Sequence, residues 1–279
     1  MTDLSIKRNH QIYNASDVAA HYAALNYLTA CESLLFESYI PIGSAVLDLG
    51  VGGGRTTPYL ASRAARYVGV DNAPAMVDAC RAKFPGGEFL VADAANLAVF
   101  ANDSFDAVVF AFNGIDFVLP EESRRQCLAH IHRILKPGGA LIFSSHNPRA
   151  ILVRPSWNRE RLERISRRFS ANSKTVNAVL LAALTSVRAP LAFFQACVSS
   201  LFRMIQRLPT RMFWRGHGEL LDSAHGGLLT HYSIPRQVIA EVVAVSLRFE
   251  RVLGNAYPES PRPLSTDWYY YVFTKPIEK

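Results

Sequence analysis

The sequence predicts an α/β fold, a doubly wound and mostly parallel sheet with helices on both faces. From about residue 45 to residue 147, short apolar runs alternate with helical patterns. The runs are too apolar for a sheet with one face in water, so they are typical of parallel strands buried on both sides. The turn at Lys136–Gly139 supports this interpretation, because proline ends a helix and glycine accepts a positive φ before the next strand.

The expected elements follow the chain in order. Five apolar runs predict the strands Ala45–Leu49, Tyr67–Val70, Glu88–Val91, Asp106–Phe110 and Ala140–Ser145. The pattern stops after Pro148 and resumes near residue 232, where Ser233-Ile234-Pro235 opens a helix that runs to about Val245. Two more strands are expected at Arg248–Gly254 and Trp268–Thr274, and the second is rich in aromatic residues that favour strands.

This break divides the chain into two predicted domains. Residues 1–148 and 231–279 form one domain, with residues 1–40 as an N-terminal helical lid, and residues 149–230 form a helical insertion between the fifth strand and the last helix. The net charge is +7, but residues 147–215 hold 13 Lys/Arg and two acids, and the remaining chain holds 17 basic and 21 acidic residues. Because the core is mildly acidic, we expect no nucleic-acid partner.

The composition is that of a globular protein, with 49% hydrophobic and 19% charged residues among 279. The four cysteines form no Cys-x-x-Cys pair, which favours a reducing compartment over a zinc knuckle or a disulfide framework. The first residues lack the apolar core of a signal peptide, so we expect a cytoplasmic location. No His/Asp/Glu cluster has metal-ligand spacing, and no metal site is expected.

The insertion allows three interpretations. Residues 157–169 predict an amphipathic basic helix, and residues 176–205 are strongly apolar around Pro190. A transmembrane hairpin is disfavoured, because each apolar half has about 14 residues where a span needs about 20. The segment is then a helical lid that packs on the core, a peripheral membrane contact through residues 155–212 for a lipid-linked, apolar or anionic acceptor, or an RNA-binding element, which the acidic core disfavours.

A glycine-rich loop follows the first predicted strand. In Asp48-Leu49-Gly50-Val51-Gly52-Gly53-Gly54, residues without side chains let the backbone bend sharply and approach a ligand. Asp71 ends the second strand about 20 residues later, where a carboxylate can accept hydrogen bonds from ribose hydroxyls. Asp93 follows the third strand at the same edge, so the glycines and acids converge on one crevice.

With these motifs the chain resembles the class I methyltransferases that depend on S-adenosylmethionine (SAM). Their Asp-x-Gly-x-Gly-x-Gly loop is matched at Asp48, Gly50, Gly52 and Gly54, and further matches lie at Asp71, Asp93, Phe105–Phe110 and Leu135–Gly139. The resemblance implies SAM as cofactor and a seven-stranded sheet whose last strand is antiparallel. A dehydrogenase would need Gly-x-Gly-x-x-Gly, and a P-loop would need Gly-Lys-Ser/Thr, so both are disfavoured.

The same resemblance implies further contacts to the cofactor. In similar methyltransferases the N-terminal stretch covers the cofactor, so Tyr13 and Tyr22 are candidates to contact its methionine part or its sulfonium, and simple packing on the sheet is the alternative. The residues Asn72 and Ala94 follow the second and third strands. Phe112 and Asn113 follow the fourth strand and would form the floor beneath the methyl group.

Three histidines are candidates for a general base, because an alcohol needs to lose its proton as it attacks. His146 ends the fifth strand at the cofactor edge, and His225 and His231 flank a glycine turn. Asn113 or Asp116 would orient the acceptor or form a turn. The leading hypothesis is O-methylation of a small-molecule or glycan acceptor, as in bacterial glycan and secondary-metabolite pathways that the C-terminal part resembles. The alternatives are N- or C-methylation of a natural product and a non-catalytic SAM-binding subunit.

Overall fold

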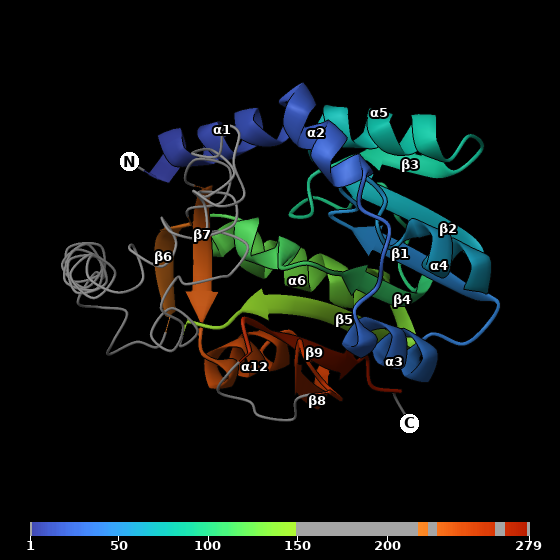
Figure 1. The fold of residues 1–279 in the computed structure, drawn as a ribbon. Helices are drawn as coiled ribbons and strands as arrows, with labels where there is room; N and C mark the ends of the chain where they lie inside the picture. The colour runs from blue at the N-terminus through green and yellow to red at the C-terminus, as the bar shows by residue number, and fades with distance from the viewer. Residues whose placement is uncertain (1, 149–216, 223–227, 260–265, 278–279) are drawn as a thin grey trace, which may run out of the picture. The chain divides into compact units, whose positions relative to one another are not determined.

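A seven-stranded sheet in the order β3-β2-β1-β4-β5-β9-β8 forms the centre of the computed structural model (Figure 1). The structure describes residues 2–148, 217–222, 228–259 and 266–277. The strands of this sheet are Ser44–Leu49 (β1), Ala64–Asp71 (β2), Glu88–Val91 (β3), Phe105–Phe110 (β4), Leu135–His146 (β5), Arg248–Gly254 (β8) and Trp268–Thr274 (β9). The first five strands pair in parallel, and β9 is antiparallel to both neighbours, so the predicted fold class is confirmed.

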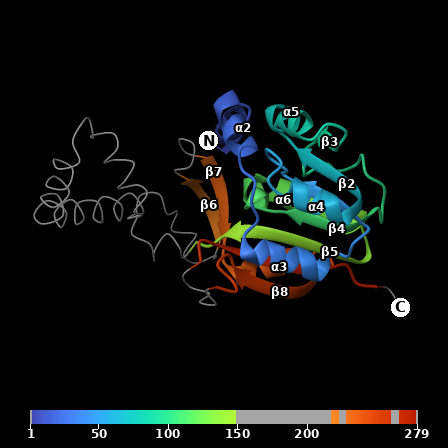
Figure 2. The ribbon, with the colours of Figure 1, turned by 45° about the vertical axis from the view of Figure 1, so that its right-hand side comes forward.

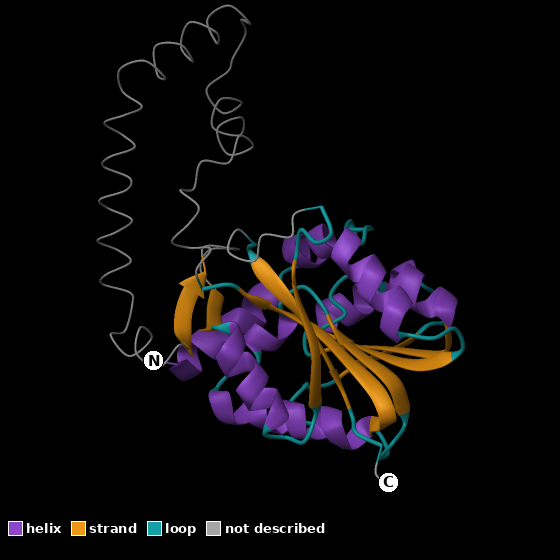
Figure 3. Ribbon diagram, turned by 90° about the horizontal axis from the view of Figure 1, so that it is seen from below, coloured by secondary structure: helices purple, strands orange, loops and turns teal. Residues whose placement is uncertain are grey.

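Helices cover both faces of the sheet (Figure 3). The helices are Thr2–Tyr13 (α1), Ser16–Ala23 (α2), Ala30–Tyr39 (α3), Thr57–Arg63 (α4), Pro74–Lys83 (α5), Glu121–Ile134 (α6) and Pro235–Val243 (α12), with the 3-10 helix Gly114–Phe117 (η1). One face packs on α3 and α4, and the opposite face packs on α6 and α12. This is the two-sided covering that continuous apolar strands require.

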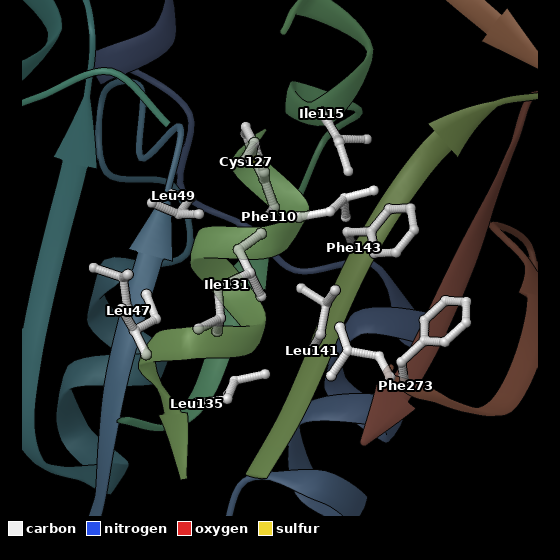
Figure 4. Packing of buried hydrophobic residues seen from close by; sticks show 14 of the residues in the cluster. Leu47, Leu49, Phe110, Ile115, Cys127, Ile131, Leu135, Leu141, Phe143 and Phe273 are labelled. Atoms are coloured by element: carbon white, nitrogen blue, oxygen red, sulfur yellow. The ribbon is translucent and has the colours of Figure 1, made fainter. Parts of the chain in front are cut away.

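The strand period of two sends alternate side chains to the two helical layers. Leu47 and Leu49 of β1 pack with Ile131 of α6, and Val46 packs with Phe36 of α3 on the other face. Figure 4 shows the first of these layers, in which the α6 side chains interlock with those of β1, β4, β5 and β9. Because helices pack on both faces of the sheet, the positions of the loops at its carboxyl edge are fixed.

A β-hairpin that the sequence analysis did not predict lies outside this sheet. Its strands, His217–Asp222 (β6) and Leu228–Ser233 (β7), pair antiparallel, so the insertion predicted as helical is β-structure over these residues. All six residues of β7 are buried, which hides the alternation by which an edge strand is recognised. Figures 1 and 2 both place the hairpin beside the carboxyl end of β5, next to α1.

Among the described helices, none is both long enough and apolar enough to cross a bilayer.

Candidate functional site

A cavity of about 470 Å³ lies at the carboxyl edge of the sheet. The glycine loop after β1, the acids after β2 and β3, the residues after β4, and the end of β5 all contribute to its wall. Of the predicted site residues, those that line it are Tyr13, Tyr22, Asp48, Gly50, Gly52, Asp71, Asn72, Asp93, Ala94, Phe112, Asn113 and His146. The size suits a nucleoside cofactor together with a small acceptor.

The glycine loop owes its shape to left-handed backbone and to a close helix. Gly50 and Gly52 have φ values of 60° and 54°, which disfavour other residues. A Cβ on Gly53 would overlap the backbone of Tyr22 and Ala23, because the end of α2 packs directly on the loop. Gly54, which was predicted to contact the cofactor, is not part of the cavity wall; a Cβ there would meet Phe84 of the chain after α5.

Asp48 is a buried carboxylate in the cavity wall, with 1% of its surface exposed. Burial raises its pKa to about 6, and hydrogen bonds from Thr56 and Tyr67 and the charge of Arg55 oppose that rise. The two hydroxyls donate to Oδ2 at 2.6 Å and 2.9 Å. The carboxylate is thus held in place and faces the space where a cationic ligand would lie.

Asp71 braces the loop from the neighbouring strand. Its Oδ2 accepts the backbone N–H of Gly52 at 2.9 Å, and its Oδ1 accepts that of Ala73 at 2.9 Å. Burial raises the pKa of Asp71 despite these backbone hydrogen bonds. Asn72 follows, and its carbonyl accepts His10 Nε2 at 3.1 Å, which ties α1 to the same turn. A carboxylate placed here with spare lone pairs suits ribose hydroxyls.

The turn after β3 completes the cofactor side. Asp93 is exposed, lines the cavity and accepts the N–H of Ala95 at 2.8 Å, and Ala94 lies between them in the wall. The rings of Tyr13 and Tyr22 lie 6.0 Å apart and line the cavity from α1 and α2. The glycine cradle, the Asp71 oxygens and these rings fit an adenosyl sulfonium, which an aromatic face attracts as a cation.

Phe112 and Asn113 both have left-handed backbone, with φ values of 56° and 63°. The Phe112 ring has the Arg55 Cζ 4.9 Å from its centroid and meets the Trp268 ring edge-on at 5.8 Å. The N–H of Asn113 donates to Ser144 Oγ at 2.7 Å. These contacts hold two unfavourable backbone conformations at the point where β4 meets the cavity.

The imidazole of His146 is paired with a buried carboxylate. Asp116 of η1 accepts His146 Nδ1 and the His146 backbone N–H at 2.7 Å each through Oδ2, and the Ser145 hydroxyl at 2.8 Å through Oδ1. Asp116 is 1% exposed. The ring of His146 lies 5.0 Å from that of Tyr232 and 6.2 Å from that of Phe117. The sequence placed Asp116 near the site, and the structure brings it against the histidine.

The other two candidate histidines are elsewhere. His225 lies outside the described residues. His231 is 4% exposed on β7, lies 6.1 Å from the His217 ring and is not part of the cavity wall. Burial, with the charges of Arg124 and His217, lowers the pKa of His231 to about 2, so this imidazole is neutral and a poor proton acceptor at neutral pH.

Sequence reasoning missed a buried ion pair beside the loop. Arg55 donates to Glu32 through both nitrogens, at 2.8 Å and 2.6 Å, and to the carbonyl of Tyr27 at 2.9 Å. Burial alone would lower the pKa of Arg55, and the hydrogen bonds and charge of Glu32 raise it. The available signal was Thr29-x-x-Glu32, a capping box that forms at the start of α3. Asp267 and Trp268, at the start of β9, are cavity residues that the sequence did not single out.

In the described part of the chain, no group of three or more His, Cys, Asp or Glu residues could hold a metal ion. The polar and aromatic groups of the cavity wall include four carboxylates, several aromatic rings and one histidine.

Known proteins match the part of the chain that contains the glycine loop. Residues 46–139 match the model of a family described as a methyltransferase domain. A demethylmenaquinone methyltransferase of Clavibacter sepedonicus is 35% identical over 120 residues, which are 42% of this chain and 47% of that protein. A tRNA (carboxymethyluridine(34)-5-O)-methyltransferase of Arabidopsis thaliana is 27% identical over 143 residues, 51% of this chain and 33% of that protein. The chain thus spans half or less of these relatives.

The fold has solved counterparts as well. The structure of a SAM-dependent methyltransferase of Methanosarcina mazei covers 91% of this chain and all of its own, with a TM-score of 0.57 and 16% identity. The strand order and the cavity define an α/β domain with a cavity at the carboxyl edge of its sheet. Residues 46–139 match a methyltransferase domain, as the sequence predicted, and the fold is shared with the SAM-dependent methyltransferase of Methanosarcina mazei.

Proposed function

We propose that the chain transfers a methyl group from SAM to a hydroxyl of a small-molecule or glycan acceptor, with His146 as general base. The observation that carries the proposal is the contact of His146 with Asp116 in the cavity wall at the end of β5. A histidine in a cofactor cavity, oriented by a buried carboxylate, is the arrangement that general-base catalysis needs.

Asp116 fixes the state of the imidazole. Its three donors, from His146 twice and from Ser145, hold the carboxylate in one orientation. Because Oδ2 accepts Nδ1–H, the neutral ring carries its lone pair on Nε2. A proton taken up at Nε2 creates an imidazolium that the same carboxylate stabilises. Asp116 is thus a positioning residue, and His146 is the proposed catalytic residue.

When bound, SAM supplies an electrophilic methyl group on a sulfonium. His146 Nε2 would take the proton of the acceptor hydroxyl, the methyl group that SAM supplies would pass to the acceptor oxygen, and S-adenosylhomocysteine would be the leaving group. The cavity wall also holds apolar and aromatic residues, among them Phe112, Phe117, Leu228 and Trp268. They align the acceptor and exclude water, which is the main contribution that such a displacement asks of a protein.

The experiment has two stages. SAM binding is measured by calorimetric titration, and turnover is then measured as S-adenosylhomocysteine release across a panel of hydroxylated acceptors. We expect His146→Asn and Asp116→Asn to bind SAM as the wild type does and to lower kcat by about 10²- to 10⁴-fold. His130→Asn on α6, a histidine outside the cavity wall, serves as the matched control.

The other outcomes identify the competing functions. Full turnover by His146→Asn contradicts the general-base proposal and favours N- or C-methylation, in which the attacking atom needs less help from a base. SAM binding without product over the whole panel favours a non-catalytic SAM-binding subunit. Failure to bind SAM contradicts the proposal altogether.

A further inference from the structure

Arg55 directly follows the glycine loop, and its side chain is 7% exposed in the cavity wall. Its guanidinium forms a two-pronged pair with Glu32 of α3, from Nη1 to Oε2 at 2.8 Å and from Nη2 to Oε1 at 2.6 Å. The Glu32 carboxylate is completely buried and also accepts the backbone N–H of Thr29 at 2.9 Å. Both carboxylate oxygens are thus engaged by groups of the protein, and they hold the guanidinium in one orientation.

Stability alone does not explain a buried ion pair at this place. The residues of α3 around Glu32 are apolar, and Cys31, Leu35 and Phe36 are completely buried in the core. Replacing a buried ion pair by apolar residues of similar volume is often neutral or stabilising, because both charges lose their hydration on folding. What the pair adds is direction, since the guanidinium is planar and its donors have fixed positions. Its contribution therefore lies in the groups that the guanidinium holds in place.

The first of these groups is the ring of Phe112, which lines the cavity. Arg55 Cζ lies 4.9 Å from its centroid, within the range of a cation–π contact. Phe112 and the next residue, Asn113, both have left-handed backbone, which is unfavourable for residues with a side chain. The N–H of Asn113 donates to Ser144 Oγ at 2.7 Å. Since this turn needs outside contacts to persist, the contact with Arg55 helps to keep it in the cavity wall.

The second group is the α2–α3 connection, residues 24–29, which runs down from α2 to α3 in Figures 1 and 2. Arg55 Nη1 donates to the carbonyl of Tyr27 at 2.9 Å, and Arg55 Cζ lies 5.2 Å from the centroid of the Tyr27 ring. Tyr27 is 46% exposed, so burial does little to hold it. Nearer to α2, Lys83 donates to the carbonyl of Leu25 at 3.2 Å, and Leu25 lines the cavity. Arg55 thus contacts both the connection that follows α2 and the turn after β4.

We propose that Arg55, oriented by Glu32, is a positioning residue that holds the α2–α3 connection and the Phe112 turn in place around the cavity. Through the connection it keeps Leu25 in the cavity wall, and through the ring contact it keeps Phe112 there. Because an unordered wall has to be ordered at the moment of binding, loss of Arg55 weakens SAM binding without unfolding the chain. The role of Arg55 does not depend on which acceptor atom receives the methyl group.

The test replaces the pair without leaving a buried charge. In the double variant Glu32→Gln/Arg55→Met, the glutamine can still accept the N–H of Thr29, so the capping box of α3 is kept while the contacts of the guanidinium are lost. The double variant should unfold at the same urea concentration as the wild type or at a higher one. Hydrogen exchange followed by NMR should be at least tenfold faster at the amides of Asn113 and Leu25, while the β1 amides keep their protection. The Kd for SAM, measured by calorimetry, should rise at least tenfold.

A second buried ion pair provides the matched control. Arg124 of α6 donates to Glu241 of α12 through Nε at 3.2 Å and through Nη2 at 2.9 Å, and neither residue belongs to the cavity wall. The corresponding double variant, Arg124→Met/Glu241→Gln, removes the same charges by the same substitutions. It should leave the Kd for SAM and the exchange at Asn113 and Leu25 within twofold of the wild type.

The variant Arg55→Lys keeps the positive charge opposite Glu32 but has no planar fork. Its Kd for SAM and its exchange at Asn113 should lie between those of the wild type and of the double variant at Glu32 and Arg55. If that double variant does not fold, Arg55→Lys decides alone, and exchange at Asn113 as slow as in the wild type overturns the proposal.

Three further results would overturn the proposal. Weaker SAM binding with unchanged exchange would mean that Arg55 contacts the cofactor directly. Faster exchange with unchanged SAM binding would confine Arg55 to a structural role. Equal losses in the Arg124→Met/Glu241→Gln control would assign the effect to the stability of the whole domain.

Discussion

Arg55 and His146, which line the cavity, are each held by a buried carboxylate. Arg55 is balanced by Glu32, which is completely buried, and Asp116 accepts three hydrogen bonds beneath His146. Removing one partner of such a pair leaves a buried charge without compensation, which typically costs about 3–5 kcal/mol. The wall is therefore preorganised at the level of single residues, before any ligand contributes.

Phe112 and Asn113, which also line the cavity, have left-handed backbone. Such a conformation costs of the order of 1–3 kcal/mol for each residue that is not glycine. It is maintained by the Arg55 and Trp268 contacts to the Phe112 ring and by the Ser144 hydroxyl. The strained backbone places one aromatic ring and one amide in the cavity wall.

We expect Asp48 to make SAM binding depend on pH. Its pKa in the free protein is about 6, so the carboxylate faces the cavity in its charged form only above that pH. We expect the Kd for SAM to rise about tenfold between pH 7.5 and pH 5, because protonation removes a negative charge that favours a cationic ligand. Calorimetric titration across this range measures the change.

The variant Asp48→Asn gives the control, with two effects of opposite sign. A raised carboxyl pKa contributes stability that is fully present below about pH 3.9 and is lost as the pH rises through 6. At pH 7.5 the variant without SAM should therefore be more stable by about 1–3 kcal/mol in urea unfolding, yet bind SAM more weakly. A pH slope as steep as that of the wild type would assign the titration to Asp71, whose pKa is also raised.

At the scale of elements, α1 connects the cofactor edge to the β6–β7 hairpin. The Asn9 amide pairs with the backbone of Leu229 in both directions, at 2.7 Å from Nδ2 to the carbonyl and at 2.9 Å from the N–H to Oδ1. The next residue, His10, contacts the carbonyl of Asn72 beside Asp71. A single helix thus holds both the turn that suits the ribose and the strand whose Leu228 lines the cavity.

We expect Asn9→Ala to loosen that connection. Loss of two buried hydrogen bonds should cost about 1–3 kcal/mol, and the amide of Leu229 should exchange with deuterium faster while the β1 and β4 amides keep their protection. SAM should bind several-fold more weakly, because the helix over the cofactor edge is less often in place. Leu4→Ala, at an exposed position of the same helix, is the control. Unchanged exchange at Leu229 would contradict this account.

The sequence predicted the elements of the sheet better than the elements beside it. Strands such as β1 and β4 are continuous apolar runs bounded by turn residues, so their existence follows from local pattern alone. The hairpin lacks such a pattern, because all six residues of β7 are buried, and its neighbours include α1 and the end of β5. Its strand character depends on neighbours that are distant in sequence.

The same distinction applies to the site. The glycine loop and Asp71 are local motifs, and their place in the cavity was predicted. The pairing of Asp116 with His146 spans 30 residues and that of Arg55 with Glu32 spans 23, so neither has a spacing that sequence alone makes visible. Gly54 shows the converse, since its motif position suggested a cofactor contact and its place in the fold is against Phe84.

At the scale of the whole molecule, the described residues belong to one unit, made of residues 1–148 and 216–279. The chain leaves this unit after β5 and returns at β6, and β9 then pairs with β5 in the seven-stranded sheet. The residues between these points carry most of the excess positive charge. Their predicted helices lie outside the described residues, and their function as a substrate lid or a membrane contact stays a proposal.

Removal of residues 155–212 tests that proposal, because the sheet, the cavity wall and both strands of the hairpin remain in the shortened chain. We expect the variant to bind SAM within about threefold of the wild-type Kd, since every cofactor-side group is kept, and to lose acceptor turnover, since a lid excludes water from the reacting atoms. Calorimetry and S-adenosylhomocysteine release measure the two effects separately. Retained turnover would show that residues 155–212 are not needed over the acceptor, and vesicle binding that persists in the shortened chain would remove them as a membrane contact.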